Sequence, residues 1–218
     1  MCFSAGASFG AATVLTVVGV ITLKKVTNYR QFPFASIPLM FAIQQFAEGF
    51  VWLSLSNVNY LAFGPPSSHI FLFFAQVAWP IWVPFSIFLL EKNAFRKKIL
   101  LAVTGIGILV GSYLSYCLFV YPIKAEINSF HIDYSLNFPM SLAWIGGLFY
   151  LISTIFPAFI SSVKRMQLLG ILIATSYVFT RIFYAGYLIS VWCFFAAIIS
   201  VIIFFIVTKM KVSVLVAK

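Results

Sequence analysis

The chain has 218 residues, of which 63% are hydrophobic and only 8% are charged, whereas soluble domains average about 45–50% and about 25%. So few charged side chains cannot cover a soluble surface of this size. The composition also excludes a disordered chain, a coiled coil, a secreted disulfide scaffold and a nucleic-acid-binding module. The fold class that remains is an all-α membrane protein.

Seven apolar runs have a length of about 20 residues, which is what one helix needs to cross a bilayer. They cover residues 5–23, 35–55, 69–90, 99–121, 138–160, 168–184 and 187–208. The runs are continuous rather than alternating, which disfavours a transmembrane β-barrel. We therefore predict a single seven-transmembrane-helix bundle over residues 1–208, followed by a short basic tail over residues 209–218.

Glycines and prolines punctuate these spans. Tyr184-Ala185-Gly186-Tyr187 is the predicted turn between the last two spans, because glycine supplies the backbone freedom of a tight reversal. Pro80 removes a backbone donor, so we expect a kink between Gln76 and Pro80. The pairs Gly6 and Gly10, Gly107 and Gly111, and Gly146 and Gly147 have spacings typical of close helix packing in membranes.

Basic residues indicate the orientation of the chain. Twelve of the 14 Lys and Arg residues lie in the tail or in loops on one side of the predicted bundle. Because positive loops are retained in the cytoplasm, we expect the amino terminus outside and the carboxyl terminus in the cytoplasm, in a multi-pass protein of a bacterial inner membrane. The net charge of +10 follows from this bias and requires no nucleic-acid partner.

The second predicted span contains a carboxylate. Gln45, Glu48 and Trp52 are spaced i, i+3 and i+7, which places them on one face of the helix. A charge in hydrocarbon costs at least about 2.5–3.5 kcal/mol, so such residues face a bundle interior or a wet cavity. The spacing predicts a polar binding site around Glu48. The alternative is a paired or protonated carboxyl group that only joins helices.

Arg181 is the second charge at membrane depth. It lies in the sixth predicted span at a height similar to that of Glu48, so an ion pair between the two is geometrically feasible. The alternative is an arginine that extends to the outer membrane interface.

The loop after the fourth span carries further polar residues. Residues 129–135 alternate between polar and apolar side chains, which predicts one strand of a small hairpin over the mouth of the bundle. His131 and Asp133 would share one face of that strand, where they could bind a metal or relay protons. A lone pair is weak support for either role, so the loop is interpreted as a structural lid, and no metal or cofactor is expected.

The three cysteines fall near the outer ends of their spans. Cys117 and Cys193 are interpreted as small buried hydrophobes, and Trp192 beside Cys193 joins the candidate binding residues. Removal of Met1 would leave Cys2 with an amine and a thiol together, an arrangement that suits a nucleophile or metal ligand. A packing role for Cys2 stays open.

The opening Met1-Cys2-Phe3-Ser4 is similar to that of an uncharacterised family of small multispan membrane proteins. The Gln45-x-x-Glu48-x-x-x-Trp52 pattern and the stretch from Ser190 to Phe195 resemble the same family. The resemblance covers the length of the chain and implies a fold without implying an activity. It also implies that the residues to examine first are Cys2, Ser4, Gln45, Glu48 and Trp52.

Three hypotheses for function remain. The first is binding or transport of a small molecule, a lipid or a proton through an outward-facing polar cavity centred on Glu48. The second is an intramembrane enzyme that uses Glu48 as an acid or base on a lipid-like substrate, together with Cys2 or His131. The third is a structural or assembly subunit. The first is favoured because polar groups converge without a recognisable nucleophile and base; membrane lipids are the expected partners.

Overall fold

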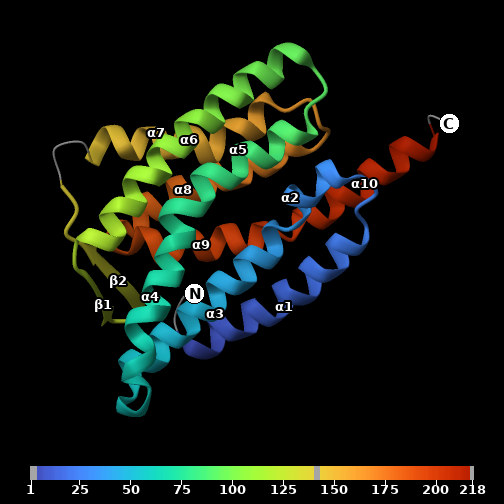
Figure 1. Ribbon diagram of the computed structural model, residues 1–218. Coiled ribbons are helices and arrows are strands. Elements are labelled where there is room, and N and C mark those ends of the chain that lie inside the picture. The colour runs from blue at the N-terminus through green and yellow to red at the C-terminus, as the bar shows by residue number, and fades with distance from the viewer. Residues whose placement is uncertain (1–3, 140–142, 217–218) are drawn as a thin grey trace.

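The computed structural model describes residues 4–139 and 143–216, which form a helical bundle with one β-hairpin (Figure 1). The helices are α1 (Ala5–Lys24), α2 (Phe32–Ala35), α3 (Ile37–Ser56), α4 (Gly64–Leu72), α5 (Trp79–Leu90), α6 (Ala94–Val120), α7 (Ala143–Ile160), α8 (Met166–Phe183), α9 (Leu188–Ile199) and α10 (Ile202–Val216). The hairpin consists of β1 (Ile123–Asn128) and β2 (His131–Leu136). Six helical segments of the described chain are long and apolar enough to cross a membrane, and α7 is a shorter apolar helix. The chain therefore has the architecture of a multi-pass membrane protein.

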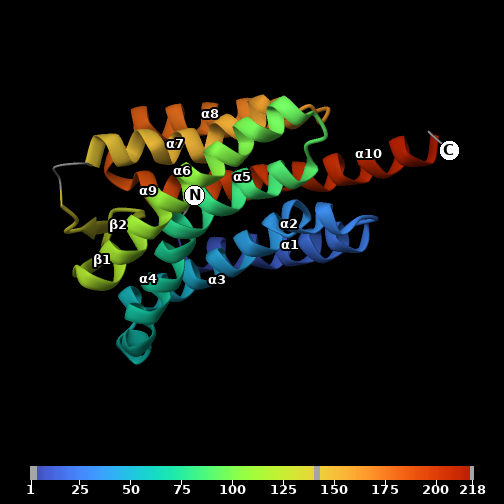
Figure 2. The same ribbon diagram turned by 45° about the horizontal axis from the view of Figure 1, so that its top comes forward.

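The connections between the long helices gather at two opposite ends of the bundle (Figures 1 and 2). We call the end that carries β1, β2 and the turn between α8 and α9 the hairpin end. We call the opposite end, which carries the α5–α6 and α7–α8 connections, the basic end. The connections and first helical turns at the basic end contain Lys92, Arg96, Lys164 and Arg165.

Pro80 interrupts the hydrogen-bond pattern of the third helical segment, Val58–Leu90. A π-helical stretch, Phe73–Ala78, precedes α5, and the Trp79 N–H donates to the carbonyl of Phe74, five residues back. The Ala75 carbonyl would pair with residue 80 in the same pattern, but proline has no N–H to donate. The Tyr150 hydroxyl of α7 donates to this carbonyl at 2.5 Å instead. The chain changes direction here between α4 and α5 (Figure 1).

Of the three glycine pairs that the sequence singles out, one lies in close contact with another helix. A Cβ on Gly107 would lie 1.8 Å from the Pro80 carbonyl oxygen, so α6 packs against α5 at backbone distance. A Cβ on Gly111 would lie 2.8 Å from Ile81 and 3.0 Å from the Val77 carbonyl oxygen. In contrast, no atom lies within 4 Å of a Cβ built on Gly10, Gly146 or Gly147. The close-packing prediction is therefore confirmed for Gly107 and Gly111 and wrong for the glycine pairs at 6 and 10 and at 146 and 147.

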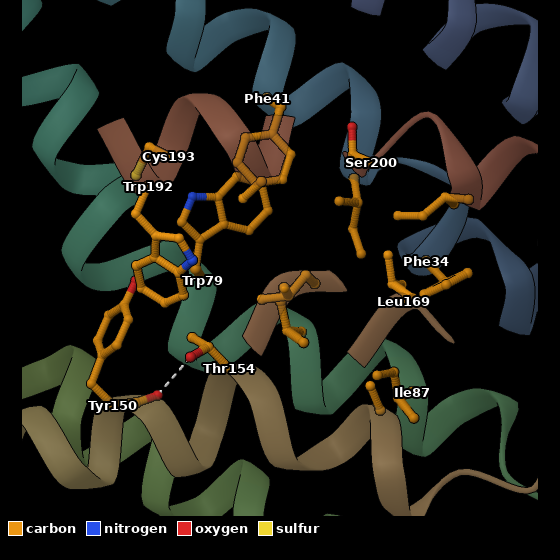
Figure 3. A pocket seen from close by; sticks show the side chains of 16 residues that line it. Phe34, Phe41, Trp79, Ile87, Tyr150, Thr154, Leu169, Trp192, Cys193 and Ser200 are labelled. Atoms are coloured by element: carbon orange, nitrogen blue, oxygen red, sulfur yellow. Dashed lines mark hydrogen bonds between the residues drawn. The ribbon is translucent and has the colours of Figure 1, made fainter. Parts of the chain in front are cut away.

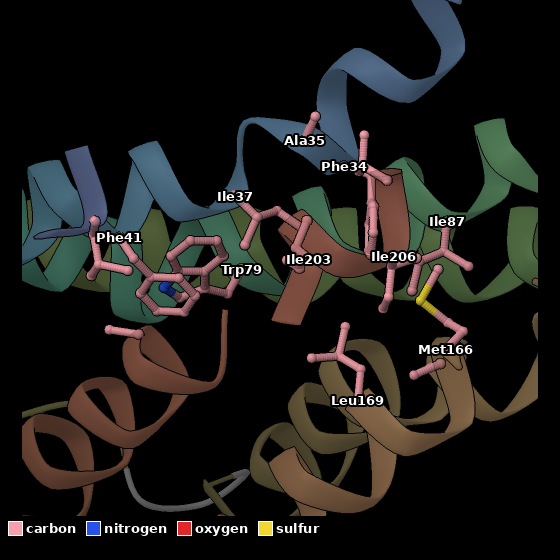
Figure 4. Close-up of a cluster of buried hydrophobic side chains, with 14 of the residues drawn as sticks. Phe34, Ala35, Ile37, Phe41, Trp79, Ile87, Met166, Leu169, Ile203 and Ile206 are labelled. Atoms are coloured by element: carbon pink, nitrogen blue, oxygen red, sulfur yellow. The ribbon is translucent and has the colours of Figure 1, made fainter. Parts of the chain in front are cut away.

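The main hydrophobic core lies toward the basic end, between α2, α3, α5, α8 and α10 (Figure 4). Phe41 and Trp79 stack there with ring centroids 4.0 Å apart. The Trp82 indole N–H donates to the Pro33 carbonyl at 2.9 Å and ties α5 to α2. Because lipid provides no hydrophobic driving force between helices, packing of these side chains holds the helices together.

The loop over the hairpin end is the antiparallel hairpin that the alternation in residues 129–135 predicts. Ser129 and Phe130 form its two-residue turn, in which Ser129 has a positive φ of 58°. Ile132 and Tyr134 are buried, and the Tyr134 ring stacks on Phe71 of α4 at 5.0 Å. The hairpin is therefore packed onto the bundle by one face.

Glu91 joins two connections at the basic end. One carboxylate oxygen accepts hydrogen bonds from the N–H groups of Lys92 and Asn93 and from the Ser162 hydroxyl, and the other accepts from the Ser162 N–H at 2.7 Å. Burial alone would raise the pKa of Glu91, but these four hydrogen bonds favour the charged form and hold the pKa below its ordinary value of 4.5.

We expect the stability that Glu91 contributes to depend on pH. A lowered pKa in the folded state means that this contribution is complete above the unfolded pKa and is lost as pH falls through the folded one. Glu91→Gln should therefore lower stability by about 1–2 kcal/mol near pH 7, because it removes the charged acceptor, and by less near pH 4. Thermal unfolding of both chains across this range measures the difference. Glu126→Gln, which changes an exposed carboxylate of β1, is the matched control, and an equal effect of Glu91→Gln at every pH would contradict this prediction.

Candidate functional site

The carboxylate of α3 lies in a fully buried polar cluster. The Gln45 amide donates to Oε2 of Glu48 at 3.2 Å, and the Ser190 hydroxyl of α9 donates to Oε1 at 2.5 Å. All three side chains have no exposed surface. The spacing of Gln45 and Glu48 on one helical face produces the first bond, whereas the second brings together segments 142 positions apart. The cluster joins α3 to α9.

Gln44, next to this cluster, ties α3 to α5. Its side-chain oxygen accepts from the Trp79 indole N–H at 2.9 Å, and both residues are buried. The bond satisfies the buried indole N–H and joins α5 to α3.

Trp52 lies on the same face of α3 as Glu48 and is buried, but its indole N–H has no hydrogen-bond partner among the described residues. The same holds for the side-chain oxygen of Gln45. A buried donor or acceptor without a partner costs about 1–3 kcal/mol. The indole therefore does not stabilise the carboxylate.

The ion pair between Glu48 and Arg181 does not form. Arg181 is exposed near the end of α8, and the described chain contains no hydrogen bond or ion pair that joins it to Glu48. Its exposure is compatible with the alternative, an arginine that extends to the membrane interface. Arg181 is exposed on α8, which packs mainly against α7 and α9 and not against α3.

The remaining polar candidates lie apart from one another. Ser4 accepts a hydrogen bond from the Ala7 N–H at 3.2 Å and so caps α1, while Cys2 lies outside the described residues. The His131 ring stacks on Tyr187 at 4.6 Å, and burial lowers the pKa of its imidazole. Asp133 lies opposite Glu126 in the register of the hairpin. No group of three or more His, Cys, Asp or Glu residues in the described chain could hold a metal ion.

A cavity of about 260 Å³ lies between α6, α7, α8 and α9 toward the hairpin end, and we call it the hairpin-side cavity. Its walls are mainly aliphatic and aromatic, and its polar groups include the carboxamide of Gln76 and the hydroxyls of Tyr113, Tyr150 and Tyr177. Gly146 and Gly147 line it as well, and their missing side chains leave space there. Glu48 is not among the lining residues.

A second cavity of about 60 Å³ lies toward the basic end, and we call it the basic-side cavity (Figure 3). Trp192, Cys193 and Tyr150 lie at one end of it, whereas Ser200 and Phe34 lie toward the other. Trp192, Cys193 and Tyr150 also line the hairpin-side cavity. These three residues therefore stand between the two cavities.

Sequence reasoning identified part of this arrangement. It selected Trp192 as a candidate but missed Gln76, Tyr150 and Tyr177. Gln76 could have been found, because it lies one helical turn before Pro80, where an irregular turn is expected. Tyr150 and Tyr177 carry no such signal among the 10 tyrosines of the chain.

Comparison with known proteins gives a family and no activity. The model of a family of unknown function, DUF6629, matches residues 1–217. This match confirms the resemblance to an uncharacterised family. No curated protein and no solved structure matches the chain.

Proposed function

We propose a binding function for this chain, which belongs to the family of unknown function DUF6629. The protein binds an uncharged, largely apolar small molecule in the hairpin-side cavity, within the membrane. The observation that carries this proposal is the lining: none of the described residues around this cavity of about 260 Å³ carries a charge. Ligand sites are typically apolar concavities with a few placed polar groups, and this cavity has that character.

The proposal includes seven crossings of the membrane. α7 has 18 residues, and at about 1.5 Å per residue it nearly spans a hydrocarbon core of about 30 Å. The basic residues at the basic end favour a cytoplasmic position for that end and an exoplasmic position for the hairpin end. The hairpin-side cavity would then lie in the outer half of the bilayer.

The cavity lining defines the class of ligand. A charged ligand would enter a site without a counter-charge and would keep an unpaired charge in low dielectric, which is strongly unfavourable. Gln76 can donate and accept a hydrogen bond, and the hydroxyls of Tyr113 and Tyr177 can do the same. A neutral molecule with one hydroxyl or carbonyl group and an apolar body fits these walls.

Glu48 has a supporting role in this proposal. It holds Ser190 on α9, while Leu188, Ile189 and Trp192 of the same helix line the cavity. The hydrogen bond therefore fixes the position of one cavity wall. The sequence predicts a binding site centred on Glu48. In this proposal Glu48 instead positions α9, and the ligand binds in the apolar cavity beside it.

Photolabelling tests the proposal. A diazirine-bearing fatty alcohol should label the peptides that contain Gln76, Tyr113 and Tyr177, as measured by mass spectrometry, and the corresponding diazirine-bearing fatty acid should not. Gly146→Leu should reduce labelling about tenfold or more, because the leucine fills space that the ligand needs and overlap with the ligand costs about 1–3 kcal/mol.

Gly105→Leu is the matched control, since Gly105 of α6 also has no atom within 4 Å of its Cβ position but lines neither cavity. Labelling should be unchanged in this variant. Equal labelling of wild type and Gly146→Leu, or preferential labelling by the fatty acid, would refute the binding proposal.

A further inference from the structure

The two cavities follow one continuous stripe on each of three helices. On α7 the lining residues include Gly146, Tyr150, Thr154 and Ala158, each four positions after the last. On α8 the corresponding residues are Leu169, Ile173 and Tyr177. Because residues four apart lie one above another on a helix, each stripe runs along the helix axis.

The stripe on α9 has the same four-residue spacing and continues past the end of the helix. Leu188 and Ile189 line the hairpin-side cavity, whereas Ala196, Ser200 and Ile203 line the basic-side cavity. The two cavities therefore follow one another along the bundle axis. Neither part has a charged residue among the described residues that line it.

Trp192 occupies the position between the two parts. It is buried, and its ring contacts Tyr150 edge-on at 6.0 Å and Tyr177 edge-on at 5.0 Å. Tyr150 is held by its hydrogen bond to the Ala75 carbonyl of the π-helical stretch.

Trp192 is less constrained than two other tryptophans of the bundle. The indole N–H groups of Trp79 and Trp82 donate to Gln44 and Pro33, whereas that of Trp192 has no partner among the described residues. Its ring can therefore rotate without breaking a hydrogen bond. Its edge-on contacts with Tyr150 and Tyr177 hold the ring between the two cavities.

We propose that the two cavities are the halves of a path through the bundle for an uncharged molecule, and that the Trp192 side chain is its gate. This inference rests on the proposed binding function and adds movement of the bound molecule toward the basic end. Rotation of the indole would join the hairpin-side cavity to the basic-side cavity. The uncharged walls exclude ions from the same path.

Thiol modification at Ser200 tests the gate. In a full-length chain with Cys2, Cys117 and Cys193 replaced by serine, Ser200→Cys places a thiol in the basic-side cavity. N-ethylmaleimide, which is small and neutral, should modify it slowly in lipid nanodiscs. Trp192→Ala should raise the rate about tenfold or more, because the gate no longer limits access. Adding Gly146→Leu to Trp192→Ala should reverse the increase, since it obstructs the hairpin-side cavity.

Two further variants guard against a trivial explanation. Trp144→Ala removes a tryptophan of α7 that is 72% exposed, and it should leave the rate unchanged. Trp192→Phe, which retains an aromatic ring if the alanine variant fails to fold, should give a smaller increase. A rate that does not depend on residue 192, or an increase that Gly146→Leu does not reverse, would overturn the gate.

The native Cys193 separates failure of the gate from failure of the binding function, because it lines both cavities. In a chain with only Cys2 and Cys117 replaced, the diazirine-bearing fatty alcohol should protect Cys193 from N-ethylmaleimide. If Cys193 is protected but the modification rate of Ser200→Cys is the same with and without Trp192→Ala, only the gate is overturned. Modification of Cys193 at the same rate with and without the alcohol would overturn the binding function, and the gate with it.

Discussion

Replacing Gly107 by alanine should destabilise the bundle more than any other single methyl group added to α6. The new Cβ would lie 1.8 Å from the Pro80 carbonyl oxygen, which is backbone and cannot rotate away. The two helices must separate, and the neighbouring contacts of Gly111 with Val77 and Ile81 would be lost with them. We expect a loss of about 3 kcal/mol, at the upper end of the usual range for overpacking.

Thermal unfolding in detergent or nanodiscs measures this effect. Gly105→Ala is the matched control, because Gly105 is two residues away on the same helix and has no atom within 4 Å of its Cβ position. Its melting temperature should equal or exceed that of the wild type, since alanine favours a helix over glycine. If both variants unfold at the same temperature, the close contact of α5 and α6 is not as described.

The second large effect is expected at Glu48. Glu48→Ala removes the acceptor for the Ser190 hydroxyl and for the Gln45 amide, and both donors are fully buried. Leaving them without a partner should lower stability by about 2 kcal/mol or more. Because α9 then loses its Ser190 hydrogen bond to α3, photolabelling of the hairpin-side cavity should also weaken.

Glu48→Gln separates a supporting role from a direct one. The amide keeps the size of the side chain and an oxygen for the Ser190 hydroxyl, so both stability and photolabelling should remain close to wild type. A well-folded Glu48→Gln protein that no longer binds the photoprobe would instead place Glu48 in the binding site, as the sequence pattern predicts.

Some features of this molecule are visible in the sequence because they depend on local patterns alone. A long apolar run makes a membrane helix in almost any tertiary context, since its backbone must pair within the segment. The alternation around Ile132 and Tyr134 likewise identifies a strand with one buried face, and the structure confirms it.

Other features depend on how the helices meet. Gly107 and Gly146 are the same residue in similar apolar surroundings, yet the first contacts a backbone carbonyl and the second faces open space. The partner of Glu48 is Ser190, a common residue within an apolar helix, rather than the conspicuous Arg181. No spacing rule identifies such pairs, because their proximity follows from the packing of distant segments.

The cavities are the hardest features to anticipate. A space arises where neighbouring helices are held apart, and its walls are ordinary membrane residues such as Leu114 and Leu151. Its sequence signal is indirect: Gln76 beside Pro80 marks the π-helical stretch, and the paired glycines mark missing side chains.

The most direct test of the account is identification of the molecule that copurifies with the full chain. Wild-type protein and Gly146→Leu would be purified identically, extracted with organic solvent and compared by mass spectrometry. We expect an uncharged, largely apolar compound that is bound to the wild type and strongly depleted in Gly146→Leu. An anionic or cationic compound bound equally by both proteins would contradict a neutral ligand in the hairpin-side cavity.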